Sequence, residues 1–394
     1  MFFLFRYMDG ARTTAVFAVV LAFALLARPA CAVGFHAGGA GNCNGCHSMH
    51  SASSGSTPLL LSADPSSICL NCHAGLGGAS SPSVFSSDGS ALTPGGDFYW
   101  LTRSFSWLDG SSPGYEHGHN IVAADFNLTA DPVLDKAPGG SFSSATLACT
   151  SCHDPHGQVG GGTPGGAQPV VVSGSYGDTP GLGGISGNYR LLGGANYQAG
   201  GWSFSQNAPI ARQSGISPFL ESDSSHVAYG SGMSEWCGNC HQGLLASDHS
   251  AGGIPFRHPA GNDKKFTQAD VDFYNSYLRS GDFSGTEATA YLQFVPFERG
   301  VTDIALLDPQ STRGPDTNSN VMCLSCHRAH ASAFANIGRW DFTASLLVDS
   351  HPAVGDVGVN TNDTYFSYYG RDISAEFGSG QGQFCEKCHG ASTP

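Results

Sequence analysis

The residues best suited to chemistry in this chain lie in a five-residue pattern, C-x-x-C-H, that occurs six times. The two thiols of such a segment can bond to the two vinyl groups of a porphyrin, and the histidine can then bind the iron from one side. The pattern therefore predicts covalently attached c-type haem. The six copies supply Cys43, Cys46 and His47; Cys69, Cys72 and His73; Cys149, Cys152 and His153; Cys237, Cys240 and His241; Cys323, Cys326 and His327; and Cys385, Cys388 and His389.

Two other uses of paired cysteines fit the pattern less well. A structural zinc site assembles its ligands in fours and gives no reason for a histidine after every second cysteine. A redox dithiol would explain one such motif but not six. The chain has 13 cysteines and the motifs use 12, so only Cys31 is left over. We expect that residue to be removed with the segment that contains it.

The first 32 residues have the pattern of a secretion signal. Two arginines precede an apolar run at residues 13–27, which is short for a membrane span. An Ala-Cys-Ala cleavage site follows, so the mature chain is predicted to start at Val33 and to form one hexahaem unit over 33–394. Lipid attachment at Cys31 is a weaker alternative, because an arginine and a proline precede it. Export fits haem attachment outside the cytoplasm.

Composition limits the fold and the partners. Glycine accounts for 54 of 394 residues, and the net charge of −14 becomes −16 when three arginines and one aspartate leave with residues 1–32. This acidity argues against nucleic acid as a partner, and no later stretch predicts a transmembrane segment. With roughly 60 residues for each haem, the chain is too short for six separate cores. We therefore predict a multihaem cytochrome c fold, mostly coil and loops with few short helices and very little sheet, wrapped around a continuous chain of six stacked haems.

A few local structures can be expected. The strongest helix signal covers residues 267–279, where Thr267 can cap the start with Asp270 three residues on and Gly281 can end it. Val271, Tyr274 and Leu278 would form its apolar stripe. Residues 169–173 could form a short strand, and residues 160–166 and 181–187 are glycine-rich loops. Each C-x-x-C-H segment is predicted to form a helical turn, because its three ligating side chains must reach one ring.

The second axial ligand of each iron separates an electron carrier from an enzyme. The predicted mature chain has ten histidines outside the motifs but only three methionines, Met49, Met233 and Met322. Six second ligands are needed, so the supply favours histidine on both sides of every iron and low reduction potentials. The methionines are more simply explained as packing residues.

Three of the other histidines follow a motif histidine by three residues: His50, His156 and His330. Three residues span at most about 10 Å, too little to circle to the far face of the same covalently fixed ring. Each is therefore expected to reach a neighbouring iron and to draw two haems together. Local context does not rank the remaining candidates, which are His36, His117, His119, His226, His249, His258 and His351.

Longer segments carry a more specific signal than the haem motif. The chain resembles the OmcS-type outer-surface hexahaem cytochromes of dissimilatory metal-reducing bacteria, which polymerise into extracellular filaments. The resemblance extends through nearly the whole mature chain. It rests on FHAGG (35–39), CHSMH (46–50), TPGGDF (93–98), GHNIV (118–122), CHDPHG (152–157), MSEWC (233–237), RHPAG (257–261), CLSCHRAH (323–330) and YYGR (368–371).

The resemblance implies six low-spin, bis-histidine haems. It also implies that His50 leaves its own subunit and binds the haem of His327 in the next one. Two histidines expected from the family near the second motif have no match, and His249 is an alternative to His36. The implied second ligands are His36, His50, His119, His156, His258 and His330.

The function predicted from these features is extracellular electron transfer by a secreted, cell-surface cytochrome that polymerises head-to-tail into a conductive filament. Its partners would be identical subunits, other multihaem cytochromes and extracellular metal oxides or other electron acceptors. A soluble periplasmic electron shuttle is the alternative. A multihaem reductase is less favoured, because all six motifs end in histidine and the other histidines can fill every sixth position.

Overall fold

The computed structural model describes residues 45–48, 59–75, 82–155, 189–213, 221–246, 249–251, 254–256, 258–378 and 386–389. Several predicted features lie outside the described residues: the signal segment 1–32, the loops 160–166 and 181–187, and the strand at 169–173. The same holds for His36, Cys43, His50, His156 and Cys385, and for the side chains of His249 and His389.

Helices in the described part of the chain are short, as predicted. None of the α-helices exceeds nine residues. They are α2 (Pro65–His73), α3 (Met233–Cys237), α4 (Gln242–Ala246), α5 (Gln268–Ser276), α6 (Cys323–Cys326), α7 (Thr361–Phe366), α8 (Ile373–Phe377) and α9 (Glu386–His389). Single 3₁₀ turns connect them: η2 (Phe98–Thr102), η3 (Gly114–His117), η4 (Ala124–Phe126), η5 (Ser144–Thr146), η6 (Cys149–Ser151), η8 (Tyr189–Leu191), η9 (Glu287–Thr289), η10 (Ile304–Leu306), η11 (Ala335–Ile337) and η12 (Leu347–Asp349).

Sheet in the described residues is limited to two-stranded antiparallel ribbons, which confirms the prediction of very little sheet. The pairs are β1 (Phe105–Trp107) with β2 (Gly110–Ser112), β3 (Gln198–Ala199) with β4 (Trp202–Ser203), β5 (Ile210–Arg212) with β6 (Ala228–Ser231), and β7 (His249–Ala251) with β8 (Ile254–Phe256). An isolated ribbon is marginal by itself, so these must be stabilised by the loops packed on them.

The predicted helix near residue 267 begins where expected but ends early. Thr267 caps α5 by accepting from the Asp270 amide, and the Asp270 carboxylate accepts from Thr267 in return. Helix α5 ends at Ser276, because Tyr277 takes an extended backbone conformation and buries its side chain. The prediction that Gly281 ends the helix and that Leu278 completes its apolar stripe is therefore wrong. Leu278 lies beyond the helix and is 44% exposed.

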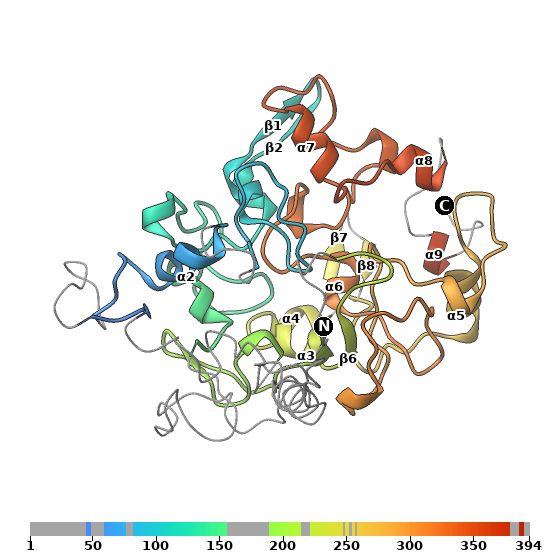
Figure 1. The fold of residues 1–394 in the computed structure, drawn as a ribbon, viewed down its shortest axis with the longest axis horizontal. Coiled ribbons are helices and arrows are strands. Elements are labelled where there is room, and N and C mark those ends of the chain that lie inside the picture. Colours follow the sequence, from blue (N-terminus) through green and yellow to red (C-terminus); the bar gives the residue numbers. More distant parts are fainter. Residues whose placement is uncertain are drawn as a thin grey trace, which may run out of the picture.

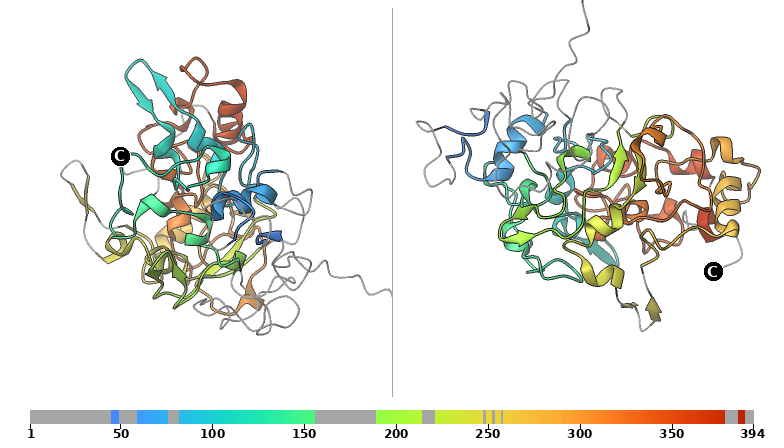
Figure 2. Two further views of the ribbon diagram at one scale, coloured as in Figure 1. Left: turned by 90° about the vertical axis from the view of Figure 1, so that its left-hand side faces the viewer. Right: turned by 90° about the horizontal axis from the view of Figure 1, so that it is seen from below.

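The helices that carry haem motifs are spread across the molecule. Helix α2 lies toward one end, α3 and α6 lie near the middle, and α9 packs with α5 at the opposite end (Figure 1). A view from below gives the same order, with α2 and α9 at opposite ends (Figure 2). The motifs are therefore distributed along the longest dimension instead of gathering in one pocket.

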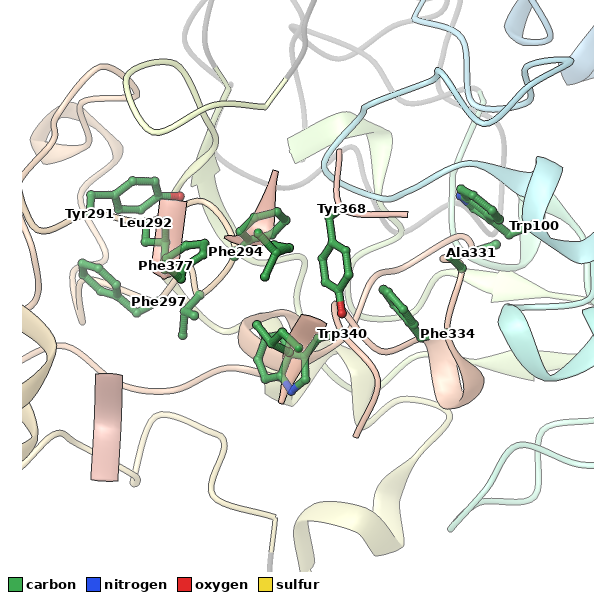
Figure 3. Close-up of a cluster of buried hydrophobic side chains, with 14 of the residues drawn as sticks. Trp100, Tyr291, Leu292, Phe294, Phe297, Ala331, Phe334, Trp340, Tyr368 and Phe377 are labelled. Atoms are coloured by element: carbon green, nitrogen blue, oxygen red, sulfur yellow. The ribbon is translucent and has the colours of Figure 1, made fainter. Parts of the chain in front are cut away.

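From the composition we expect the chain to wrap around stacked haems, but it also forms an apolar core of its own. Aromatic side chains from distant segments meet in one buried cluster, among them Trp100, Phe294, Phe334 and Tyr368 (Figure 3). The Tyr368 ring lies 6.1 Å from that of Phe294 and 5.0 Å from that of Phe334, both between centroids. Burial of large aromatic side chains gives much of the free energy that offsets ordering so much irregular chain.

No helix in the described part of the chain is long and apolar enough to cross a membrane.

Candidate haem attachment sites

The described haem motifs form helical turns, as predicted. The second motif ends α2, the fourth begins at the last residue of α3, the fifth forms α6 and the sixth lies in α9, whereas the third forms the 3₁₀ turn η6. In the third, fourth and fifth motifs, the amide of the histidine donates to the carbonyl of the first cysteine, at 2.9–3.0 Å. Such a turn brings both thiols and the imidazole toward one side, as attachment to one ring requires.

Four of the motif histidines are held by backbone carbonyls. Because a carbonyl oxygen can only accept, Nδ1 must carry the proton, and the lone pair of Nε2 is left for a metal. Burial also lowers the pKa of His241 and His327, which favours the neutral, ligating form. The four Nδ1-to-carbonyl hydrogen bonds are His73 to Pro82 at 2.9 Å, His153 to Arg190 at 2.8 Å, His241 to Pro138 at 2.8 Å and His327 to Asn336 at 2.8 Å.

Cysteines of consecutive motifs lie beside one another. The side chains of Cys69 and Cys149 are close enough to shift each other's pKa, as are those of Cys237 and Cys323. Cys46 is close enough to Cys69 to interact with it electrostatically, and Cys240 is close enough to Cys152 to do the same. The first five motifs therefore follow one another through the protein in the order of the sequence.

The sixth motif is held by its own lysine. Lys387, between the two cysteines of the motif, is buried, and its Nζ donates to the carbonyls of Tyr274 and Tyr277 at 2.9 and 3.1 Å. The ammonium also lies 4.2 Å from the centre of the Tyr274 ring. Burial lowers the pKa of Lys387 to about 8. These contacts fix α9 against α5 and so fix the position of the sixth attachment site.

Two predicted second ligands lie opposite motif histidines. The ring centres of His119 and His241 are 6.1 Å apart, and those of His330 and His153 are 6.2 Å apart. Two imidazoles on opposite sides of one iron have centres roughly 6 Å apart, since each metal–nitrogen bond is about 2 Å and each ring centre lies about 1 Å beyond its nitrogen. Both pairs therefore fit an iron between them.

The surroundings of these two histidines keep them neutral. Burial, and then the neighbouring His241, lowers the pKa of His119 to about 4, and burial lowers that of His330 to about 3. The His119 Nδ1 donates to the Ala329 carbonyl at 2.7 Å. The His330 ring stacks on Phe98 at 4.9 Å, and a Cβ on Gly95 would come within 2.8 Å of its Nδ1. The glycine thus leaves room for the ring.

Three other candidate histidines have protein partners instead. His117 is fully buried, with Nδ1 bonded to the Trp100 carbonyl at 3.0 Å and Nε2 to the Ser112 hydroxyl at 2.7 Å. Its two nitrogens are therefore occupied. His226 stacks on Tyr291 at 3.7 Å. His351 stacks on Trp107 at 3.9 Å and bonds to Asp356 at 2.6 Å.

Of the remaining described candidates, one histidine lies near a haem motif and two methionines lie in an apolar cluster. Burial is the largest cause that lowers the pKa of His327, and His258 lies close enough to lower it further. It is therefore near the fifth motif within the same subunit. Met233 and Met322 are buried in one small apolar cluster, which supports the prediction that they are packing residues.

Sequence reasoning missed a buried charge network beside the fifth motif. Glu221 Oε2 accepts from Arg328 Nη1 at 2.7 Å and lies 3.5 Å from Arg339 Nη1, and all three side chains are fully buried. Burial alone would raise the pKa of Glu221, but the two guanidinium groups hold it below its ordinary value. Arg339 also donates through Nε to the Leu324 carbonyl inside the motif at 2.6 Å. Nothing in the local sequence of Glu221 indicates this role.

Arg339 Nη2 and Glu221 Oε1 have no hydrogen-bond partner, although both atoms are buried. Buried polar atoms are nearly always paired, so the network is incomplete without a further group beside the fifth motif. Together with the imidazole pairs and the oriented thiols, these orphaned atoms fit a bound haem with its polar substituents.

Short helical turns bearing paired thiols and oriented imidazoles, carried on a chain with little regular structure, define a multihaem c-type cytochrome. Residues 36–78 match the model of the doubled CXXCH motif family. The chain is 39% identical to the C-type cytochrome OmcS of Geobacter sulfurreducens, over 94% of this chain and 97% of that protein. It belongs to the OmcS family of c-type cytochromes, and covalent c-type haem is its cofactor.

Two solved structures share the fold. They are described as a cryo-EM structure of the OmcS nanowires from Geobacter sulfurreducens and as the outer membrane cytochrome S filament from the same organism. Each is 36% identical to this chain and covers 90% of it and 100% of the solved chain, with TM-scores of 0.72 and 0.71. The predicted fold class, a mostly irregular multihaem cytochrome c, is confirmed.

Proposed function

We propose that this chain is a subunit of an extracellular filament that conducts electrons through six covalently attached haems. The observation that carries the proposal is the order of the motif cysteines, which lie beside one another from the first motif to the fifth. Haem iron supplies the reversible one-electron step. The chain's own residues supply the cysteines that attach the haems, the spacing between neighbouring haems and the neutral imidazoles that bind the irons. This arrangement suits electron conduction along the molecule.

The ligand arrangement favours electron transfer over catalysis. We assign His119 as the second ligand of the iron bound by His241, and His330 as that of the iron bound by His153, on the ring separations of 6.1 and 6.2 Å. The other proposed second ligands are His36, His50, His156 and His258. An iron with protein ligands on both faces offers no position for a substrate, so the chain acts as an electron carrier and not as a reductase.

Head-to-tail assembly follows from the proposed role of His50. If this imidazole binds the iron of His327 in the next subunit, each subunit has one donating and one accepting end, and such contacts form open filaments. The solved relatives are filaments by their descriptions. We further propose that residues 1–32 are a cleaved signal, that 33–394 form one unit on the cell surface, and that other multihaem cytochromes and extracellular metal oxides exchange electrons with it.

The number of haems and the start of the mature chain can be tested together. Intact mass spectrometry of the native protein should show six haem additions on a chain that begins at Val33. The reason is that every cysteine after this position belongs to a C-x-x-C-H motif. Five haem additions would show that one of the six motifs does not carry haem. A mass that includes Cys31 would contradict the proposed cleavage.

The filament can be tested by electron microscopy of the secreted native protein and of a His50→Ala variant. The native sample should contain filaments. The variant should still carry every covalent haem, because no attachment residue changes, but its filaments should be shortened or absent and one iron per subunit should become high-spin.

His258→Ala is the matched control for the filament test, because it also removes a proposed second ligand, but one that lies near His327 within the same subunit. It should likewise make one iron per subunit high-spin but leave the subunit contact in place. Normal filaments from the His50→Ala protein, with all irons low-spin, would show that His50 is not the shared ligand. Dispersed native subunits in the secreted fraction would favour the soluble shuttle.

A further inference from the structure

The structure contains a repeat that the sequence outside the haem motifs hardly shows. The second and third motifs contact each other in the same way as the fourth and fifth. In each pair the turns that carry the two motifs pack together, α2 with η6 and α3 with α6. The first cysteine of one motif lies close enough to the first cysteine of the other to shift its pKa: Cys69 with Cys149, and Cys237 with Cys323. In the haem-loaded protein these sulfurs are thioethers, so each contact brings equivalent edges of two porphyrins together.

A serine hydroxyl lies beside each sulfur contact. Ser66 Oγ accepts from the Cys149 amide at 3.2 Å, and Ser234 Oγ accepts from the Cys323 amide at 3.1 Å. Both serines are fully buried. Each precedes the first cysteine of its own motif by three residues, which places hydroxyl and sulfur on one face of the helical turn.

The repeat continues beyond these contacts. The third and fifth motifs each begin with a capped turn, in which the residue before the first cysteine donates its amide to the hydroxyl of Ser151 or Ser325, at 3.0 and 3.1 Å. Each motif histidine then donates to a carbonyl in a pair of left-handed residues. These pairs are Arg190 with Leu191, at φ 49° and 58°, and Asn336 with Ile337, at φ 57° and 58°.

Left-handed backbone is costly for residues with a Cβ, so two copies of the same strained pair mark a geometry that the fold maintains. The amide after each histidine donates to the carbonyl of the second residue of its pair, at 2.6 Å for Asp154 to Leu191 and 2.8 Å for Arg328 to Ile337. The third and fifth attachment sites are thus built alike in backbone as well as in side-chain contacts.

We infer that Ser66 and Ser234 are positioning residues that set how two neighbouring haems face each other. Each hydroxyl binds the amide of the first cysteine of the next motif, and that cysteine carries one attachment bond of the next porphyrin. The serine and its own cysteine therefore hold the partner motif at two points. This inference rests on the proposed haem chain but does not depend on filament formation, since both contacts lie within one subunit.

The test is the electronic coupling of the haems in native, haem-loaded protein carrying Ser66→Ala, Ser234→Ala or both. Coupled porphyrins give a two-signed circular dichroism signal in the Soret band, and its amplitude depends on their relative orientation. Each single variant should lose amplitude, and the double variant should lose roughly the sum because the two sites are separate. Covalent haem content should stay unchanged.

Ser67→Ala is the matched control, since Ser67 is equally buried in α2 but bonds to Asp64 and to the Asp125 amide. It should lower the thermal midpoint without changing the Soret signal. The inference is overturned if the Ser66 and Ser234 variants keep the full signal, or if Ser67→Ala reduces it equally.

If an alanine variant does not take up haem, the threonine variants decide, because Ser66→Thr and Ser234→Thr retain the accepting oxygen. Haem loading and a native Soret signal with threonine would support the role of the hydroxyl. Failure of threonine and alanine alike would show that packing alone matters. Absence of filaments in the native sample would count against the proposed function and leave this inference standing.

Discussion

Replacement of Glu221 by alanine will lower the free energy of unfolding by about 3–5 kcal/mol, the usual cost of removing one partner from a buried ion pair. The variant leaves Arg328 and Arg339 as two buried positive charges with no carboxylate between them. The loss should be measured as a shift of the denaturant midpoint of haem-loaded protein, followed through the Soret band. The fifth attachment site should be affected first, because Arg339 is bonded to it.

The matched control for this variant is Glu287→Ala. Glu287 pairs with Arg313 on the surface, where both side chains are largely exposed. Removing an exposed pair should cost less than about 1 kcal/mol. Equal effects of the two variants would show that the buried network does not stabilise the fold. A larger effect of Glu221→Ala that is absent in Glu221→Gln would indicate that shape and hydrogen bonding matter more than charge.

The second large effect is expected from His119→Ala. The variant should retain its covalent haems, but the iron held by His241 should lose its ligand on the opposite side and become high-spin. Cyanide should then bind at the vacated position, whereas the native protein should not bind it. Electron paramagnetic resonance and the ferric absorption spectrum report both changes. His330→Ala should have the same effect on the iron held by His153.

His117→Ala controls for the loss of a buried imidazole. His117 lies two residues from His119, is fully buried and bonds only to protein atoms through its two nitrogens. Its removal should lower stability and leave every iron low-spin. A low-spin spectrum in the His119→Ala protein would contradict the assignment. Cyanide binding by the native protein would revive the possibility of a reductase.

What the sequence predicts well is set by short-range chemistry. The turns at the haem motifs and the start of α5 depend on residues within four positions of each other, such as the reciprocal cap of Thr267 and Asp270. The end of α5 was missed because Tyr277 is drawn into the aromatic core by residues far along the chain. Burial of Tyr277 therefore ended the helix before Gly281 was reached.

Long-range partners could not be predicted from spacing. The pairing of His119 with His241 joins residues more than a hundred positions apart. Of the other histidines, His117 bonds to the Trp100 carbonyl and His226 stacks on Tyr291. Glu221 is separated from Arg328 by 107 positions. One signal was available and was not used: a serine three residues before the first cysteine in both the second and fourth motifs.

The carbonyl groups that hold the motif histidines have a consequence for how this protein can change over evolutionary time. Every residue type carries a carbonyl, so a substitution at Pro82, Pro138 or Asn336 need not remove the acceptor. What selection must preserve at these positions is a backbone path and not a side chain. Related chains can therefore differ widely in loop sequence while their motif histidines keep the same orientation. Variation at the acceptor positions says little about whether an attachment site is intact.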